Sequence, residues 1–310
     1  MNNDINIASR ASLYSDLNHF YDLFNKNKEE YLKFNNDLPE DLKKKYKTIL
    51  LRQFLYQLFS IMEIFFNDSC IRFLISYPGN IGNTKNDIDL LTEVSTLTAA
   101  IKYHAEKKIN ELSYKRTSEY INGIYEIFGE KNDNDESIIG KIIEGKATRD
   151  LYMHNNGKIN HLYFEKTGKY SRYNNIDEEL KINENYLDEL TDTITFMVND
   201  FKNKCIEKYK NDTPLNTFRK MWEMSILNKH VKFDEQWHVY EGFVGETASI
   251  TDLEWHWSGS EMALFNFFRC IHGANTDDAL IKDIPYALYR WKGRVEERII
   301  QSWLEYQFYL

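Results

Sequence analysis

The chain has 310 residues, of which 42% are hydrophobic and 15% aromatic, so it can bury a substantial core in one large domain or two ordinary ones. This composition argues against intrinsic disorder. The formal net charge of −9 argues against a protein that coats nucleic acid, because Lys and Arg contacts to phosphates supply most non-specific affinity.

The first part of the chain predicts long helices, since only four prolines and 13 glycines interrupt runs rich in Leu, Ile, Glu, Lys and aromatic residues. Apolar residues at helical spacing predict a first helix over about 10–35 and a central core helix over about 40–77. Pro78-Gly79 should end the core helix, because proline cannot continue the hydrogen-bond ladder. The pattern over about 88–128 predicts further helix, broken near Ser113.

A turn-rich stretch at 132–135 precedes a predicted helix over about 136–154. Asn155-Asn156-Gly157 should end this helix, because Asn and Gly tolerate the left-handed conformation that closes a helix. A basic, tyrosine-rich loop is expected to continue to about 180. An amphipathic helix should then follow over about 184–210.

The composition changes near residue 211, where we predict a boundary between two parts of the chain. Residues 1–210 should form a helical bundle, and residues 211–310 a helical, aromatic-rich C-terminal subdomain. Thr213-Pro214 has the pattern of a helix start, with proline at the first helical position. The C-terminal part holds all six tryptophans of the chain: Trp222, Trp237, Trp255, Trp257, Trp291 and Trp303. The predicted fold class is therefore all-α.

Two further helices are predicted in the C-terminal part. Ser258 and Glu261 have the spacing of a capping box, which would open a helix over the apolar run 262–271. A final helix is expected over about 285–308.

The sequence predicts neither export nor membrane insertion. The N-terminus lacks a leader, and no run approaches the roughly 18 apolar residues that cross a bilayer. Cys70, Cys205 and Cys270 are odd in number and far apart, which argues against a disulfide framework and excludes a thiolate metal knuckle. We therefore expect a cytoplasmic protein with reduced cysteines and no membrane partner.

No metal or cofactor site is expected. None of the eight histidines pairs at the spacing of a zinc-binding H-E-x-x-H helix, and no glycine loop could cradle a phosphate. The acidic run from Asp133 has Ile138 at the position where a calcium loop requires glycine. His238 and His256 lie beside tryptophans, in an aromatic packing cluster or a partner surface.

One window of this acidic chain is locally basic. Residues 141–173 contain seven cations and three carboxylates, a net charge of +4. Such a window is either a local binding surface for anions or a solvated basic loop.

Arg149, Asp150 and His154 form the remaining group of chemically interesting residues. Five helical steps turn about 500°, so the side chains of Arg149 and His154 lie on different faces of the helix. Asp150 lies four residues before His154, so its carboxylate can reach and orient the imidazole. The C-terminus of the helix also places partial negative charge beside the imidazole. Both effects favour a histidine that can carry charge near neutral pH.

The segment from Arg149 to His154, followed by Asn155-Asn156-Gly157, resembles the R-x4-6-H signature of the HEPN superfamily of small helical proteins. The helix that contains Glu63 is similar to the helix that precedes the motif in such proteins, and the resemblance covers about residues 45–205. It implies a metal-independent endoribonuclease of the kind found among bacterial toxins and phage-defence effectors. It also implies a homodimer in which two motifs form one composite site.

The resemblance also implies roles for individual residues. His154 would act as general base or acid around the ribose 2′-hydroxyl and the leaving 5′-oxygen, and Arg149 would stabilise charge on the phosphorane. The products would be a 2′,3′-cyclic phosphate and a 5′-hydroxyl. Supporting residues would be Asp150, Asn155 and Glu63, although a glutamate on a core helix can equally pair with an arginine for structural reasons. RNA contacts would come from Lys146, Lys158, Lys166, Lys169 and Arg172.

Two features limit what the resemblance implies. Asn156 stands where some toxin members have a tyrosine, so regulation by modification of that tyrosine does not carry over. The sequence also leaves a second hypothesis open, a non-catalytic helical interaction module such as an inhibitor or scaffold. Its C-terminal tryptophans would be contact anchors, although six tryptophans also suit a small aromatic core. A toxin-like enzyme would in addition need an inhibitor or sensor protein as partner.

Overall fold

The computed structural model describes residues 6–82, 97–240, 243–246, 257–272 and 278–306. Within these ranges the protein is predominantly helical, as predicted. Contacts divide the chain into two compact units. We call residues 16–71 and 105–207 the motif unit, because they contain Arg149 to His154. We call residues 1–15, 72–104 and 208–310 the tryptophan unit.

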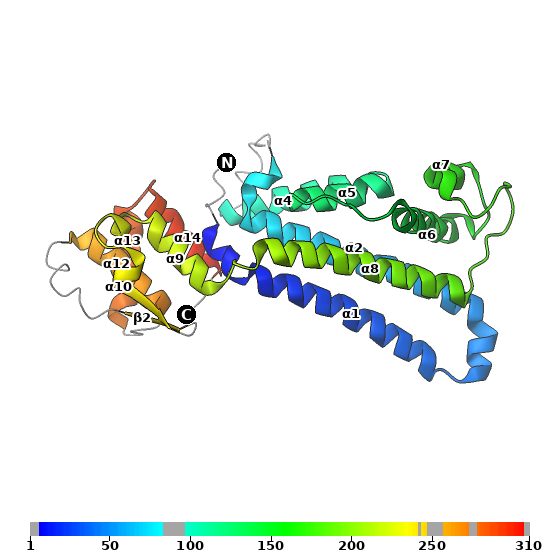
Figure 1. The fold of residues 1–310 in the computed structure, drawn as a ribbon, viewed down its shortest axis with the longest axis horizontal. Coiled ribbons are helices and arrows are strands. Elements are labelled where there is room, and N and C mark those ends of the chain that lie inside the picture. Colours follow the sequence, from blue (N-terminus) through cyan, green and yellow to red (C-terminus); the bar gives the residue numbers. More distant parts are fainter. Residues whose placement is uncertain (1–5, 83–96, 241–242, 247–256, 273–277, 307–310) are drawn as a thin grey trace. The chain divides into compact units, whose positions relative to one another are not determined.

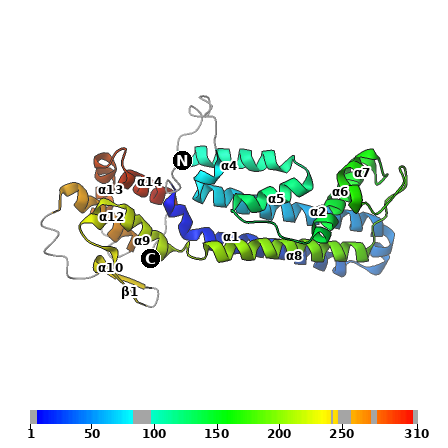
Figure 2. The same cartoon turned by 45° about the horizontal axis from the view of Figure 1, so that its top comes forward.

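Three long helices run side by side in the motif unit: α1 (Leu13–Asp37), α2 (Glu40–Ser76) and α8 (Glu184–Tyr209) (Figures 1 and 2). Aromatic side chains join them at one level. The ring of Phe65 on α2 lies 6.1 Å from that of Phe24 on α1 and 6.0 Å from that of Phe201 on α8, measured between centroids. Tilted and edge-to-face pairs of this kind are the favoured aromatic geometries.

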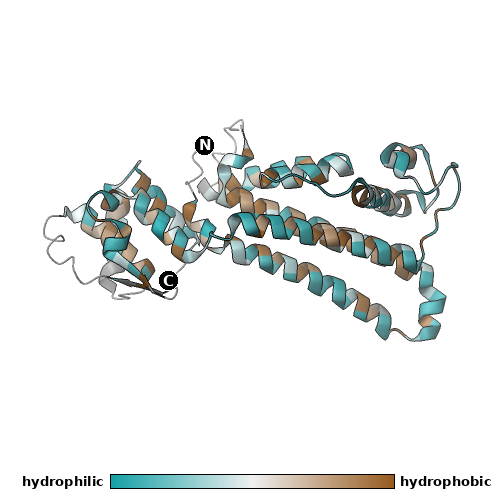
Figure 3. Ribbon diagram, viewed as in Figure 1, coloured by the Kyte–Doolittle hydropathy of each residue, from teal (hydrophilic) through white to brown (hydrophobic). Residues whose placement is uncertain are grey.

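The central helix α2 is by length and composition long and apolar enough to cross a membrane, a test that the core helix of a soluble protein also passes. The sequence expectation that no segment approaches such a span is therefore corrected. In Figure 3 the N-terminal end of α2 is mostly hydrophilic, and hydrophobic residues gather further along the helix. Leu58, Phe59 and Met62 are completely buried in the motif unit, as expected of a core helix.

The remaining helices of the motif unit are shorter. The predicted break near Ser113 is confirmed, because α4 (Leu97–Ser113) ends there and α5 (Thr117–Ile127) begins four residues later. Helix α6 (Glu136–Asn155) is seen almost end-on in Figure 1, so it crosses the long helices. The segment predicted as a loop contains a short helix, α7 (His161–Thr167), followed by the 3-10 turn η3 (Gly168–Tyr170).

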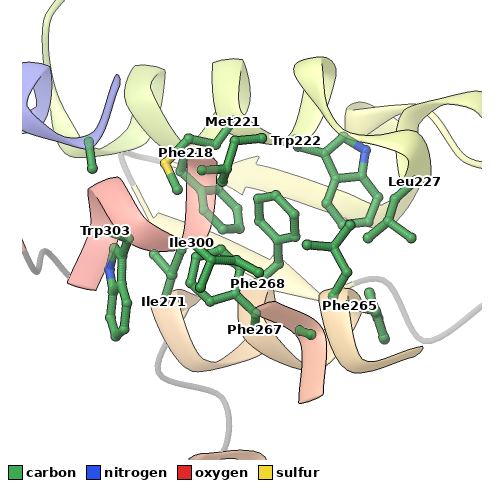
Figure 4. Close-up of a cluster of buried hydrophobic side chains, with 14 of the residues drawn as sticks. Phe218, Met221, Trp222, Leu227, Phe265, Phe267, Phe268, Ile271, Ile300 and Trp303 are labelled. Carbon is green, nitrogen blue, oxygen red and sulfur yellow. The ribbon is translucent and has the colours of Figure 1, made fainter. Parts of the chain in front are cut away.

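Short elements make up most of the tryptophan unit. Its elements are η1 (Ile7–Ser12), η2 (Pro78–Ile81), α9 (Pro214–Met224), η4 (Ile226–Lys229), α10 (Phe233–Gln236), β1 (Trp237–Tyr240), β2 (Phe243–Glu246), α12 (Gly259–His272), α13 (Asp278–Arg290) and α14 (Val295–Tyr306). Strands β1 and β2 pair antiparallel, with Trp237 opposite Glu246. The core of this unit is rich in aromatic side chains from α9, α12 and α14 (Figure 4). Ile7, Ala8 and Ala11 of η1 belong to the same core.

Local signals of the sequence are confirmed at two helix starts in this unit. The Thr213 side chain accepts a hydrogen bond from the backbone of Asn216 at the start of α9. At the start of α12, the backbone N–H of Ser258 donates to Glu261 (2.8 Å), and that of Glu261 donates to the Ser258 hydroxyl (3.3 Å). This reciprocal pair is the predicted capping box.

Two expectations for the C-terminal part are wrong. The expected single final helix is two helices, α13 and α14, because the chain turns at Gly293. Gly293 has a φ of +77°, a conformation that residues with a Cβ atom disfavour. The β1–β2 hairpin also departs from the expectation that residues 211–310 form a helical subdomain. The two contact-defined units also differ in make-up from the predicted ranges 1–210 and 211–310, since residues 1–15 and 72–104 group with the C-terminal part.

Candidate active site

Helix α6 carries the motif and ends where the sequence predicts. Asn156 has φ +50° and Gly157 has φ +79°, and the backbone N–H groups of both donate to the carbonyl of Leu151. A left-handed residue followed by glycine satisfies the last free carbonyls of a helix. His154 thus lies in the last turn of α6, and its side chain is exposed.

The chain after His154 is fixed by backbone pairing with a distant segment. Ile159 donates to the carbonyl of Glu178 (3.0 Å), and Leu180 donates to that of Gly157 (2.9 Å). The Asn155 side-chain amide donates to the carbonyl of Lys158, so Asn155 helps to fix this turn. The position of His154 is therefore set by both sides of the helix end.

Arg149 faces α2, where it binds Glu63. One terminal nitrogen of its guanidinium lies 3.1 and 3.2 Å from the two carboxylate oxygens of Glu63. Lys146 binds the same carboxylate at 2.9 Å. The Arg149 side chain is 18% exposed and that of Glu63 is 27% exposed, so the pair is neither buried nor fully solvated. Glu63, expected as a supporting residue, is thus the direct partner of Arg149.

Asp150 does not orient His154 as the sequence suggested. Its carboxylate binds Lys166 at 2.6 Å and Arg149 at 3.4 Å, and the structure gives no hydrogen bond or ion pair between Asp150 and His154. The physical reason is competition, because the carboxylate already has two cationic partners, Lys166 and Arg149. Asp150 therefore links Arg149 to Lys166.

His154 lies beside a shallow hollow of about 50 Å³ formed by the end of α6 and by α7, with Asp150, Asn155, Tyr163 and Lys166 around it. Arg149 does not line this hollow. The difference follows from helix geometry, because five residues along α6 turn the two side chains about 140° apart. One copy of the helix consequently presents Arg149 and His154 to different neighbours.

Most of the cations predicted to bind RNA have carboxylate partners. Lys146 binds Glu63, Lys166 binds Asp150, Lys169 binds Glu136, and Arg172 binds Glu144 through its Nε at 2.8 Å. Lys158 is exposed and has no ion pair among the described residues. The local excess of positive charge is therefore reduced by Glu63 and Glu136, which lie outside the basic window. Arg172, predicted as an RNA contact, also holds the buried carboxylate of Glu144 in place.

That carboxylate, Glu144, is the most important polar residue that the sequence did not reveal. Its side chain is 4% exposed, and it accepts hydrogen bonds from Thr148 (2.7 Å), Tyr163 (2.8 Å) and Tyr186 (2.8 Å) besides its ion pair with Arg172. A buried charge is tolerated when it is paired and fully hydrogen-bonded. Burial and the nearby Glu144 carboxylate raise the pKa of Tyr186, so this phenol stays a donor.

Arg52 on α2 is a second residue that sequence reasoning missed. Its guanidinium lies 4.5 Å from the ring centroid of Tyr152 and donates to the side chain of Asn156 at 3.3 Å. It therefore adds a cation at the closed end of α6. The signal was weak, because Arg52 precedes Asn156 by 104 positions and only the fold brings them together.

The tryptophans are core residues rather than surface anchors wherever the structure describes them. Trp222 and Trp237 are completely buried, and Trp291 and Trp303 are 5% exposed. Trp257 packs against the same core, whereas Trp255 and His256 lie outside the described residues. His238 is exposed on β1. This burial weighs against the hypothesis in which tryptophans contact a partner.

Among the described residues, no group of three or more His, Cys, Asp or Glu side chains could hold a metal ion. The acidic loop before α6 is also occupied, because the Lys204 ammonium lies 3.3 Å from Asp133 and 3.2 Å from Asp200. Comparisons of the chain with protein-family models, curated proteins and solved structures find no match.

Proposed function

We propose that the protein is an endoribonuclease that needs no metal ion and uses His154 and Arg149 of helix α6. The observation that carries the proposal is the exposed His154, held in the last turn of α6 next to a row of paired charges that includes Arg149. The resemblance to the HEPN motif supports it. So does the partial exposure of Arg149, which leaves its guanidinium within reach of a substrate.

In the proposed reaction the ribose 2′-oxygen attacks phosphorus and the 5′-oxygen leaves. His154 accepts the proton of the 2′-hydroxyl or returns one to the leaving oxygen, and a histidine can do either near neutral pH. Arg149 binds the non-bridging oxygens as negative charge builds up on the phosphorane. The products are a 2′,3′-cyclic phosphate and a 5′-hydroxyl.

We propose further that two copies of the chain form the site, with α6 at a two-fold interface. In one copy the side chains of Arg149 and His154 point about 140° apart around the axis of α6. A second copy therefore offers a way to bring a guanidinium and an imidazole to one phosphate. Exposed apolar side chains lie next to these residues: Ile64 (56% exposed), Met153 (53%) and Leu162 (53%). Covering them in a dimer interface would be favourable.

The biological setting that fits this proposal is a cytoplasmic toxin or antiviral defence effector, restrained by an inhibitor or sensor protein. The RNA substrate is not specified by the proposal. Growth arrest by the overexpressed chain, and its absence with His154→Ala, would support a toxin role.

The activity is tested with labelled RNA in excess chelator. His154→Ala should lower cleavage at least roughly a hundredfold, because general acid–base catalysis is typically worth about 10²–10⁴ in rate. Arg149→Lys should also impair cleavage, because an ammonium lacks the planar fork that binds two phosphate oxygens. His161→Ala is the matched control, since His161 is exposed on neighbouring α7 and should leave cleavage unchanged.

The proposal is wrong if cleavage requires a metal ion or survives in His154→Ala that circular dichroism shows to be folded. The dimer is tested separately by sedimentation. The wild type should sediment as a dimer at micromolar concentration, and Met153→Asp should shift it towards monomer and lower cleavage. A strictly monomeric wild type with full activity would refute the composite site.

A further inference from the structure

A second concave site lies on another side of helix α6 within the motif unit. It is a cavity of about 260 Å³, close to the lower limit of about 300 Å³ for small-ligand pockets. Three segments line it: α6, α8 and the stretch after α7. The lining residues used below are Gly140, Lys141, Glu144, Tyr170, Arg172 and Tyr186.

The polar wall of the cavity is already satisfied. Glu144 has four donors, as described above, and the guanidinium of Arg172 lies 3.8 Å from the ring centroid of Tyr186. A carboxylate has room for about four hydrogen bonds, so Glu144 has no need of a charged ligand. An occupant must therefore gain its affinity from the aromatic and apolar walls.

The aromatic wall depends on the glycine opposite it. A Cβ atom at Gly140 would overlap the ring of Tyr170, so only glycine lets this ring lie so close to α6. The Tyr170 hydroxyl binds Glu136 at 2.9 Å, which fixes the outer end of the ring. Tyr170 is thus held as a wall of the cavity from both sides.

The cavity has charged groups at its edge. Lys141 and Glu189 form an ion pair at 3.4 Å, with side chains 53% and 69% exposed. Exposed pairs of this kind contribute at most about 1 kcal/mol, so either partner can turn to a ligand. Lys141 can meet a phosphate, and Glu189 can accept a hydrogen bond from an exocyclic amine.

We propose that this cavity binds a nucleobase, with the base against Tyr170 and Tyr186 and the sugar-phosphate at Lys141. Bases stack on aromatic rings. Tyr170 and Tyr186 both line the cavity, and the guanidinium of Arg172 covers one face of the Tyr186 ring. Free nucleotides and single-stranded RNA share this chemistry. The choice of RNA as the source rests on the proposed ribonuclease function.

The position of the cavity predicts a distance between base recognition and cleavage. Gly140 and His154 are 14 residues apart on α6, which corresponds to about 21 Å along the helix axis. Tyr163 connects the two places, because it lines the hollow beside His154 and donates to Glu144. A base in the cavity would therefore select a cleavage site some nucleotides away rather than the adjacent bond.

Calorimetric titration tests the proposal with three probes: the four nucleoside 5′-monophosphates, ribose 5-phosphate, and an uncleavable 2′-O-methyl RNA. Nucleotide or RNA should bind and ribose 5-phosphate should not. Tyr170→Leu should weaken binding roughly 5- to 150-fold, the range measured for loss of one stacking ring. Tyr114→Leu is the control, since Tyr114 is 84% exposed elsewhere in the motif unit.

Equal binding by wild type and folded Tyr170→Leu, or binding of ribose 5-phosphate as tight as that of the nucleotides, would overturn the pocket. So would the absence of binding by all nucleotides and the RNA. Binding of monophosphates without binding of the RNA would make a free nucleotide the ligand and overturn RNA as the source. Measuring base binding and cleavage on the wild type and on His154→Ala separates the two proposals. Base binding by both proteins with cleavage by neither refutes the nuclease alone. Cleavage by the wild type without base binding refutes the pocket alone.

Discussion

Replacing Glu63 with glutamine should increase the affinity of the protein for RNA. Glu63 is the shared partner of Lys146 and Arg149, at 2.9 and 3.1 Å. An RNA phosphate that binds Arg149 must compete with this carboxylate. Glutamine keeps the size of the side chain and one acceptor oxygen, but it removes the charge that both cations neutralise. The substitution therefore tests whether Arg149 contacts phosphate.

The size of the effect follows from the number of cations released. If both Lys146 and Arg149 gain a phosphate contact, the slope of log K against log salt should become more negative by about 1.4, at about 0.7 per contact for single strands. Between 50 and 200 mM salt, the gain in affinity over wild type should then shrink about sevenfold. Cleavage should rise less than affinity, because Glu63 also holds Arg149 in position.

The assay is fluorescence anisotropy with an uncleavable 2′-O-methyl RNA at four salt concentrations. Glu126→Gln is the matched control, because it changes the net charge equally at an exposed carboxylate on α5. The control should leave the salt slope unchanged. An unchanged slope and affinity in folded Glu63→Gln would show that Arg149 and Lys146 do not bind phosphate, and the proposed role of Arg149 would fail.

Three further predictions concern stability. Glu144→Ala should lower the free energy of unfolding by about 3 kcal/mol in urea titrations, because it leaves Arg172 without its buried partner; a loss under 1 kcal/mol would contradict this account. Gly157→Ala should cost about 1–2 kcal/mol, since φ is +79° there, and it should lower the melting temperature measured by circular dichroism. Glu261→Gln should destabilise by about 1 kcal/mol at pH 7, followed by tryptophan fluorescence. Burial opposes ionisation of Glu261, but hydrogen bonds from Ser258 lower its pKa below 4.5. The wild-type advantage should therefore persist above pH 4.5 and vanish as the pH falls through the folded pKa, and a difference that stays constant into acid would rule out this linkage.

The features that the sequence predicts well are those fixed by neighbouring residues. The end of α6 depends on Asn156 and Gly157, and the capping box of α12 depends on Ser258 and Glu261. In each case the hydrogen bonds join residues within six positions of one another. Local signals of this kind need no knowledge of the fold.

The ion pairs of the site could not be predicted, because their partners are distant in sequence. Glu63 lies 86 positions before Arg149, and Glu144 meets Tyr186 across 42 positions. The sequence instead suggested that Asp150 would bind His154, its neighbour one helical turn away. That contact is absent because Lys166, brought in by α7, takes the carboxylate. The helix α7 itself was missed, although Asn160 caps it by accepting from the backbone of Tyr163.

If the proposed ribonuclease function holds, the paired charges would let an acidic chain act on RNA without binding it broadly. Lys146, Glu63, Arg149, Asp150 and Lys166 form a row in which each carboxylate lies between two cations. Their formal charges sum to +1, so the row attracts a polyanion only weakly at long range. A phosphate gains most where it can offer two oxygens to the planar guanidinium of Arg149, because this geometry strengthens charge-assisted hydrogen bonds. Under the proposed function this arrangement would favour fit at one phosphate over general affinity for RNA, because a phosphate would have to compete with Glu63 for Arg149.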